Sequence, residues 1–338
     1  NKDGDKAVDS WKKSGDNWYW LNEDGEMATD MLVEDDDNYY YVNENGAMVA
    51  NQWVAIENED AGEEGEPDHY WYYFQANGKA YKRNDNSATI AAKTINGKKY
   101  AFDTEGKMLF GWVSDTDFER QTDEDTAWQD GVYYFGGEDD GAMRTNTWEL
   151  ISITTDENTD EVQPGDEFWD EDQDRWFYFQ SSGKKKAAKP EDKYTDKKIN
   201  GKKYGFDQYG RMVASWFSKD VEKGSMSKAS TGEADYSHSF MYFSSPEDGA
   251  RFTKGWFKVV PGYYLYESKY SDGADYWYYA NGDGNILANR VKKIKGKTYA
   301  FDSYGRMISG LALIEYNGGS DSDGEVITKY DDDSESRY

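Results

Sequence analysis

The sequence lacks cysteine altogether, and its 338 residues include only two histidines and five prolines. Without cysteine, no disulfide can stabilise a small fold. Basic residues are outnumbered as well, since 39 Lys and Arg stand against 67 Asp and Glu, a net charge of -28. Such a field repels phosphate polymers and argues against a nucleic-acid-binding protein. No run of about 18 apolar residues is present, so we expect no membrane span.

Leucine and isoleucine are few, and the mean hydropathy is strongly negative. A single core of roughly 300 residues is normally built from Leu, Ile and Val. The apolar mass lies instead in 13 Trp, 29 Tyr and 15 Phe, which make up 17% of the chain. An acidic disordered tail would be poor in such residues. The composition therefore predicts many small cores built from aromatic rings.

Three kinds of aromatic unit recur along the chain, which is typical of a repeat protein. One is the string Ile-Asn-Gly-Lys-Lys-Tyr-Ala-Phe-Asp at 95–103, which returns with few changes at 199–207 and 294–302. The units lie near residues 11–31, 37–53, 69–80, 95–112, 131–148, 174–186, 199–216, 239–256, 275–288 and 294–311. We expect one continuous array over 1–338, with a partial further repeat at 312–338. Because the sequence begins and ends inside a period, we expect a fragment of a longer array.

Each unit has the pattern of a β-hairpin. In the string at 95–103, Tyr100 and Phe102 fall on one face of a strand, and Gly106 supplies a turn before a second segment begins at Met108. An isolated hairpin is marginally stable in water, whereas stacked hairpins bury one another's rings. The sequence therefore predicts an all-β fold. We expect an elongated solenoid of about ten stacked β-hairpin repeats, with inserted acidic loops and almost no helix.

The order of residues at 11–27 is Trp, Gly, Trp-Tyr-Trp, Gly and Met. This pattern resembles the choline-binding and cell-wall-binding repeats of Gram-positive surface proteins. The string at 95–103 is similar to the glucan-binding repeats of streptococcal glucansucrases and to the repetitive oligopeptides of clostridial toxins. The resemblance extends over nearly the whole chain outside the long loops. It implies a fold of stacked hairpins, ligand sites between successive hairpins, and a secreted protein at the bacterial cell surface.

Aromatic residues that close or open a unit are the candidate walls of these ligand sites. They are Trp11, Trp18, Trp53, Trp71, Trp112, Tyr133, Trp148, Trp176, Trp216, Tyr242, Trp256 and Trp277. A quaternary ammonium ion packs on such rings through cation–π attraction of about 0.5–2 kcal/mol per ring, and a sugar ring can lie on the same surface. The alternative is that the rings only pack the solenoid. Inserted segments separate every pair of walls except Trp11 and Trp18, and could cover them.

Catalysis is not expected from this chain. Its two histidines lie in no recognisable nucleophile, metal or acid–base motif, and accidental carboxylate pairs are inevitable in so acidic a sequence. We therefore expect a non-catalytic module that attaches a secreted bacterial protein to choline-containing teichoic acid or to a neutral glycan. The alternative function is structural: a spacer, or a subunit of an extracellular fibre that associates with copies of itself.

No cofactor is expected, although acidic loops could bind Ca²⁺, which takes about six to eight oxygen ligands. Asp321, Asp323 and Glu325 form one of the densest small acidic clusters, without the spacing of an EF-hand loop. A solvated acidic surface, which keeps an aromatic-rich chain soluble, is the simpler interpretation of these residues.

Overall fold

Pairs of residues with positive φ set the short hairpin turns in the computed structural model. Asn96 and Gly97 have φ of 49° and 83°, and Asn200 and Gly201 have φ of 48° and 86°. Positive φ at both central residues gives a two-residue turn whose twist matches that of the flanking strands. The antiparallel strands accordingly pair on either side of these dipeptides.

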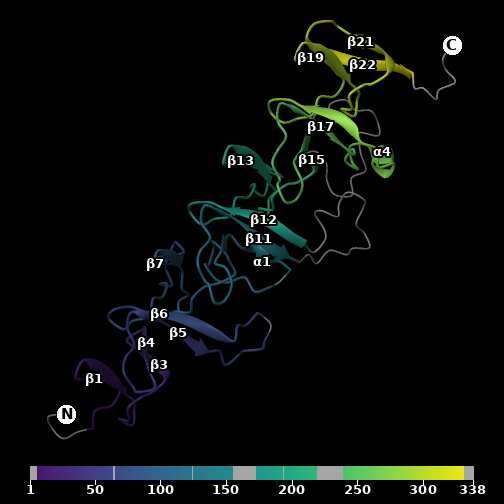
Figure 1. The fold of residues 1–338 in the computed structure, drawn as a ribbon. Coiled ribbons are helices and arrows are strands. Elements are labelled where there is room, and N and C mark those ends of the chain that lie inside the picture. Colours follow the sequence, from purple (N-terminus) through teal and green to yellow (C-terminus); the bar gives the residue numbers. More distant parts are fainter. Residues whose placement is uncertain are drawn as a thin grey trace. The chain divides into compact units, whose positions relative to one another are not determined.

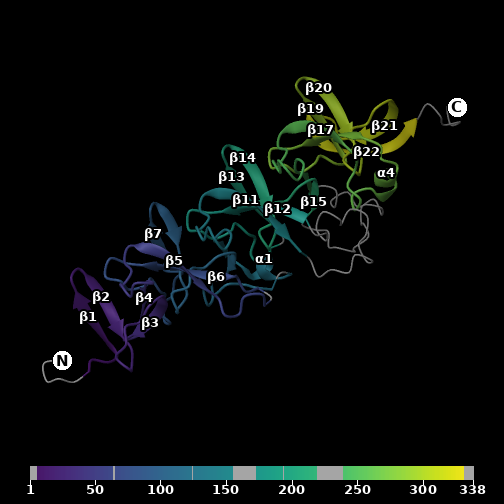
Figure 2. The same cartoon turned by 60° about the horizontal axis from the view of Figure 1, so that its bottom comes forward.

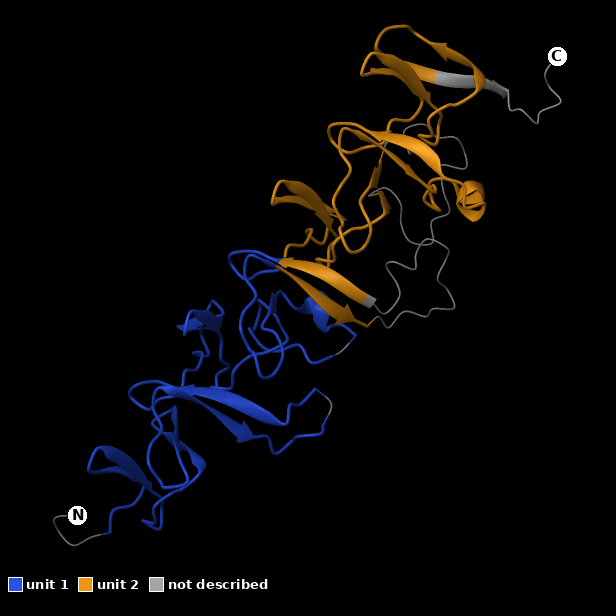
Figure 3. Ribbon diagram, viewed as in Figure 1, with its two compact units in different colours: residues 1–147, 179–185 blue, residues 148–178, 186–338 orange. Residues whose placement is uncertain are grey.

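The structure describes residues 6–63, 65–123, 125–154, 173–192, 194–218 and 239–330. The chain divides into two units (Figure 3), which are residues 1–147 with 179–185 and residues 148–178 with 186–338. Within each unit, consecutive strands pair as antiparallel hairpins, which Figures 1 and 2 draw as adjacent arrows. In the described part of the chain, the sheets have two strands each, apart from one four-stranded sheet with the order β20-β19-β22-β21.

The first unit contains β1 (Ser10–Ser14), β2 (Asn17–Leu21), β3 (Met31–Asp35), β4 (Asn38–Val42), β5 (Gln52–Glu57), β6 (His69–Phe74), β7 (Lys93–Ile95), β8 (Lys98–Tyr100), β9 (Trp112–Val113), α1 (Ala127–Asp130) and β10 (Tyr133–Tyr134). The second contains β11 (Thr147–Ile153) and β12 (Gln173–Phe179), except Thr147 and Phe179, which belong to the first unit. It also contains β13 (Thr195–Ile199), β14 (Lys202–Phe206), β15 (Trp216–Ser218), β16 (Phe240–Tyr242), β17 (Gly255–Val259), α4 (Glu267–Ser271), β18 (Tyr276–Ala280), β19 (Arg290–Ile294), β20 (Lys297–Phe301), β21 (Leu311–Tyr316) and β22 (Asp321–Tyr330).

The segments that pair to form each hairpin differ from the expectation. We expected the hairpin turn at Gly106, but β7 and β8 pair across the preceding dipeptide, and Phe102 and Met108 are joined only by an isolated bridge. In this segment only Gly106 has positive φ, 88°, so the turn does not match the twist of a two-residue hairpin. We call this segment and its equivalents exit turns, because each follows the second strand of a hairpin.

The inserted segments join the two strands of one hairpin, as between β5 and β6 and between β9 and β10, and do not join successive hairpins. A Trp that we expected to close one unit and the ring expected to open the next therefore lie on the two strands of a single hairpin.

A side-chain oxygen at one position holds those exit turns that have Asp or Asn there. Asp103 Oδ1 accepts hydrogen bonds from the backbone N–H groups of Glu105 and Lys107 at 2.9 and 2.8 Å. The equivalent oxygens belong to Asn22, Asn43, Asp207, Asn281 and Asp302. This explains the Asp that ends the repeated string, because Asp and Asn side chains bond the backbone two residues on and so favour turns.

The exit turns also join each hairpin to the one before it. The Met108 N–H donates to the carbonyl of Trp71 at 2.8 Å, and the Met212 N–H donates to the carbonyl of Trp176 at 2.9 Å. A Cβ on Gly141, in the following exit turn, would lie 2.3 Å from Met108 Sδ. Glycine is therefore required where a methionine packs against the next turn, and this contact accounts for the recurring Gly and Met.

The all-β prediction is confirmed. The helices in the described residues are α1 and α4, of four and five residues. The cores are small clusters rich in rings, with Phe74, Phe179, Phe206 and Phe301 among the fully buried side chains. No helix among the residues that the structure describes has the length and hydrophobicity needed to cross a membrane.

Candidate ligand sites between hairpins

Trp148 on β11 stands at the centre of a cluster of rings from two successive hairpins. Its ring centroid lies 5.2 Å from that of Tyr178 on β12, 4.9 Å from Tyr204 and 5.6 Å from Phe206 on β14. Trp176 meets Trp148 edge-on at 6.4 Å. Both indoles are only partly buried. The cluster thus combines two Trp rings from one hairpin with a Tyr ring from the next, and part of its aromatic surface faces solvent.

The same plan occurs around Trp53 and Trp256. The centroid distances from Trp53 are 5.1, 4.9 and 5.8 Å to Tyr73, Tyr100 and Phe102. The distances from Trp256 are 5.1, 4.7 and 5.7 Å to Tyr279, Tyr299 and Phe301. The three clusters therefore agree to within about 0.2 Å, as expected where hairpins of equal register stack.

A fourth cluster lies near the N-terminus. Trp11 is opposite Trp20 in the register of β1 and β2, with centroids 5.3 Å apart, and lies 5.0 Å from Tyr40 on β4. Trp18, two residues before Trp20, is 41% exposed, and Trp277, which has the same place in the Trp256 cluster, is 43% exposed. We call these four clusters the Trp11, Trp53, Trp148 and Trp256 junctions.

A methionine accompanies each of the four junctions. Met108 packs in the Trp53 junction and Met307 in the Trp256 junction. The equivalent residues, whose N–H groups likewise donate to the preceding hairpin, are Met48 at the Trp11 junction and Met212 at the Trp148 junction. A polarisable thioether against aromatic edges makes a favourable contact and suits a site that adapts its shape.

Residues 8–53 match the family model of the choline-binding repeat. This segment consists of choline-binding repeats. It contains every residue of the Trp11 junction, so the resemblance that we drew from the sequence is confirmed where that junction lies. The sequence is also 25% identical to Glucosyltransferase-S of Streptococcus mutans serotype c over an aligned length of 271 residues, and the match covers 74% of this chain.

Solved structures to which the chain is similar include the modular autolysin LytC and choline binding protein F, both from Streptococcus pneumoniae. The likeness to the autolysin has 17% identity and a TM-score of 0.43, and covers 93% of this chain and 52% of that one. For choline binding protein F the values are 18% and 0.37, with 88% and 92% covered. The chain spans 16% of the length of the glucosyltransferase and about half of the autolysin.

Outside the segment of matched choline-binding repeats, Trp112 is packed in the core. Its side chain is 7% exposed and its ring lies 5.0 Å from Tyr134. Tyr133, the expected partner, pairs with Val113 and so points to the opposite face of the strand, where it is buried. A Cβ on Gly131, just after α1, would lie 2.7 Å from Trp112 Cβ, so the inserted segment covers this ring closely.

Trp216 also contacts an inserted segment, although it is only partly buried. Its indole Nε1–H donates to the carbonyl of Val260 at 2.8 Å, in the segment inserted between β17 and β18. Its cross-strand neighbour Tyr242, 5.2 Å away, stacks on Phe257 at 4.9 Å, and burial raises the pKa of Tyr242. Tyr278 beneath them is fully buried. Both rings are partly buried and pack against this core, and the insertion holds the indole N–H of Trp216.

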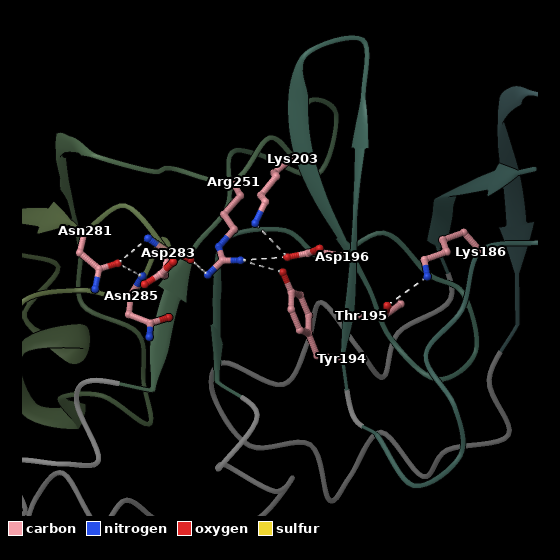
Figure 4. A network of polar contacts seen from close by, with 9 residues as sticks. All are labelled: Lys186, Tyr194, Thr195, Asp196, Lys203, Arg251, Asn281, Asp283 and Asn285. Atoms are coloured by element: carbon pink, nitrogen blue, oxygen red, sulfur yellow. Dashed lines mark hydrogen bonds and ion pairs between the residues drawn. The ribbon is translucent and has the colours of Figure 1, made fainter.

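Arg251 occupies the exit-turn position that is methionine at the four junctions. Figure 4 shows its guanidinium between two hairpins, where Nη1 donates to Tyr194 Oη at 3.1 Å and lies 3.4 Å from Asp196 Oδ2. Its Nη2 donates to the carbonyl of Asp283 in the next exit turn. These bonds tie neighbouring hairpins together, so we assign this contact a structural role.

Trp71, the outer ring of the Trp53 junction, has a polar partner of its own. Its indole Nε1–H donates to Asp139 Oδ1 at 3.0 Å, and His69 Nε2 lies 3.1 Å from the same oxygen. The hydrogen bonds from Trp71 and His69 hold the pKa of Asp139 below its usual value. The carboxylate comes from the exit turn that follows β10, two hairpins further along the chain.

The acidic cluster at the C-terminal end is engaged by basic side chains. Asp321 Oδ2 lies 2.7 Å from Lys292 Nζ, and this bond together with Arg290 lowers the pKa of Asp321. Asp323 pairs with Arg290 at 3.0 Å. The side chain of Glu325 lies outside the described residues. No group of three potential metal ligands was found among the side chains that are described.

Sequence reasoning missed half of each junction. The cross-strand rings Trp20, Tyr73, Tyr178 and Tyr279 and the rings from the next hairpin, Tyr40, Tyr100, Tyr204 and Tyr299, were not among the candidate walls. The sequence contained a signal for the cross-strand rings, because the aromatic residue two positions after each outer Trp lies on the same face of the strand as that Trp. The Tyr of the repeated string was likewise predicted to share a strand face with the Phe two residues later, and both pack against the central Trp.

Proposed function

We propose that the chain is a non-catalytic module that holds a secreted protein to a Gram-positive cell wall by binding choline on teichoic acid. Each of the four Trp junctions would take one quaternary ammonium head. The observation that carries the proposal is the shared plan: the Trp11 junction lies within the segment of choline-binding repeats, and three further junctions repeat its arrangement of rings.

The chemistry of the junctions suits such a ligand. A trimethylammonium group offers no hydrogen-bond donor, and its positive charge is attracted to the faces of Trp and Tyr by about 0.5–2 kcal/mol per ring. The net charge of -28 makes the potential around the protein favourable for a cation. A polymer with many choline groups could engage several weak sites on one chain, which raises the overall affinity by avidity.

Isothermal titration calorimetry with choline tests the proposal. We expect four sites per chain. The substitution Trp148→Ala should leave three, whereas Trp216→Phe, at a ring outside the four Trp junctions whose indole N–H is bonded to an insertion, should leave four. The absence of any binding heat from a protein with its normal circular dichroism spectrum would refute the choline proposal.

A second candidate ligand is a neutral glucan. The match to Glucosyltransferase-S, which extends over 74% of the chain, favours it, since a sugar ring can stack on the same Trp faces. Dextran titrated under the same conditions separates the two ligands. If neither ligand binds, the structural alternative, a spacer or fibre subunit, becomes the better account of the rings.

A further inference from the structure

Lys185 is a buried cation beside a Trp ring. Lys185 lies in the exit turn that follows β12 and is 8% exposed. Its ammonium lies 5.3 Å from the centroid of Trp112, within the range of a cation–π contact. A positive charge is costly to bury unless it is paired and hydrogen-bonded, so the surroundings of this ammonium must supply partners.

The partners are main-chain carbonyls at the end of α1. Lys185 Nζ donates to the carbonyl of Trp128 at 2.7 Å and to that of Gln129 at 2.9 Å. The last carbonyls of a helix have no partner within the helix, and a lysine often satisfies them. The backbone N–H of Lys185 donates to the carbonyl of Val132 at 2.8 Å, which fixes the exit turn against the preceding hairpin.

The position of Lys185 in the repeat relates it to the four Trp junctions. It lies two residues after the exit-turn glycine, where the four Trp junctions have Met48, Met108, Met212 and Met307. The ring of Trp112 corresponds to the central Trp of those junctions, since it lies 5.0 Å from its cross-strand Tyr134 and 5.9 Å from Phe179 of the next hairpin. An ammonium group thus fills a junction of the same plan.

We propose that the Trp112 cluster is a primary-ammonium site and that its occupant is the chain's own Lys185. The two carbonyls need N–H donors, which a primary ammonium has and choline lacks. The site therefore selects an ion that the four Trp junctions do not select. It also clamps the inserted segment onto the hairpin and keeps this junction closed to external ligands. The inference goes beyond the proposed function, because it holds whether or not the Trp junctions bind choline.

Chemical rescue of the full chain tests the site. Lys185→Ala should lower the melting temperature by roughly 10 °C, because it removes the ammonium that donates to both carbonyls. Added n-propylammonium, which matches the missing Cγ–Nζ portion of the side chain, should restore at least about half of this loss. Choline at the same concentration has the same charge and no N–H. It should therefore raise the melting temperature of Lys185→Ala no more than it raises that of the wild type.

Two variants control the rescue. Lys184→Ala removes the neighbouring lysine, which is 45% exposed and pairs with Asp115, and should be neither destabilised nor rescued. Lys185→Met fills the space without donors, so it should melt below the wild type and show no rescue. Equal rescue by choline, or no rescue at all, would overturn the proposal. If Lys185→Ala does not fold in any buffer, Lys185→Met decides, and a wild-type melting temperature for it would also overturn the proposal.

Discussion

The Trp53 and Trp148 junctions have nearly the same rings and different outer walls. The central Trp lies 4.9 Å from the Tyr of the next hairpin in both. Trp176 faces Trp148 edge-on at 6.4 Å, whereas the indole N–H of Trp71 is bonded to Asp139. The inner rings are thus set by strand register, which both hairpins share, and the outer ring is set by a loop residue, which they do not.

The loop residue can be traced in both units. The exit turn after β10 contains Asp139 and Asp140, and the exit turn after β16 contains Glu247 and Asp248. The second acid has the same partner in each, since Asp140 pairs with Lys98 at 3.3 Å and Asp248 with Lys202 at 2.9 Å. The first acid differs. Glu247 accepts a hydrogen bond from Ser245, which lowers its pKa, and so does not hold an outer Trp.

The largest effect should come from removing the central ring, and it should be equal in the two junctions. Trp53→Ala and Trp148→Ala each delete an indole that packs against its cross-strand Tyr and two rings of the next hairpin, at a cost of about 3–4 kcal/mol in the free energy of unfolding. Each variant should also lose one choline site. Urea unfolding followed by circular dichroism measures the stability. A difference above about 1 kcal/mol between the losses of stability in the two variants would show that the inner rings of the two junctions are not equivalent.

A second pair of substitutions should act in opposite directions. Asp207, in the exit turn beside the Trp148 junction, is buried and paired with Arg211 at 2.7 Å. Asp207→Asn leaves a buried guanidinium without its counter-ion and should cost about 3 kcal/mol. Asp103, beside the Trp53 junction, has Lys107 at the corresponding position, and Lys107 pairs with Glu105 instead. Asp103→Asn should therefore stabilise by about 1 kcal/mol at neutral pH, since Asn keeps the acceptor oxygen.

The pH dependence of stability sharpens this pair. Burial raises the pKa of Asp103 to about 6. Because the folded state then holds its proton more tightly than the unfolded state, Asp103 favours folding in acid, and this contribution is lost as pH rises from about 4 through about 6. The loss amounts to up to about 3 kcal/mol. Urea unfolding at a series of pH values should show this slope in the wild type and not in Asp103→Asn. A slope that persists in the variant would contradict the assignment.

The sequence was sufficient to predict the hairpin repeats, because Asn96-Gly97 and the alternation of Tyr100 and Phe102 act locally. It could not place the outer walls. The indole N–H of Trp71 is bonded to Asp139, two hairpins away, and no local pattern carries that information. The covering of Trp112 depends on a four-residue helix inside an insertion, whose sequence gives no helical periodicity. Contacts made by inserted segments therefore distinguish the four Trp junctions from the rings of Trp112 and Trp216.

The smallest effect should come from the loop residue that distinguishes the two junctions. Asp139 is exposed, so Asp139→Ala should leave the melting temperature close to that of the wild type. It should release the indole N–H of Trp71, whose ¹H–¹⁵N resonance would shift, and weaken choline binding at the Trp53 junction about twofold because a nearby carboxylate is lost. Glu247→Ala is the matched control, and should leave the Trp176 indole resonance and the Trp148 junction unchanged. If both variants shift their outer Trp equally, the exit-turn acid does not set the wall, and the difference between the two junctions must arise within the hairpins themselves.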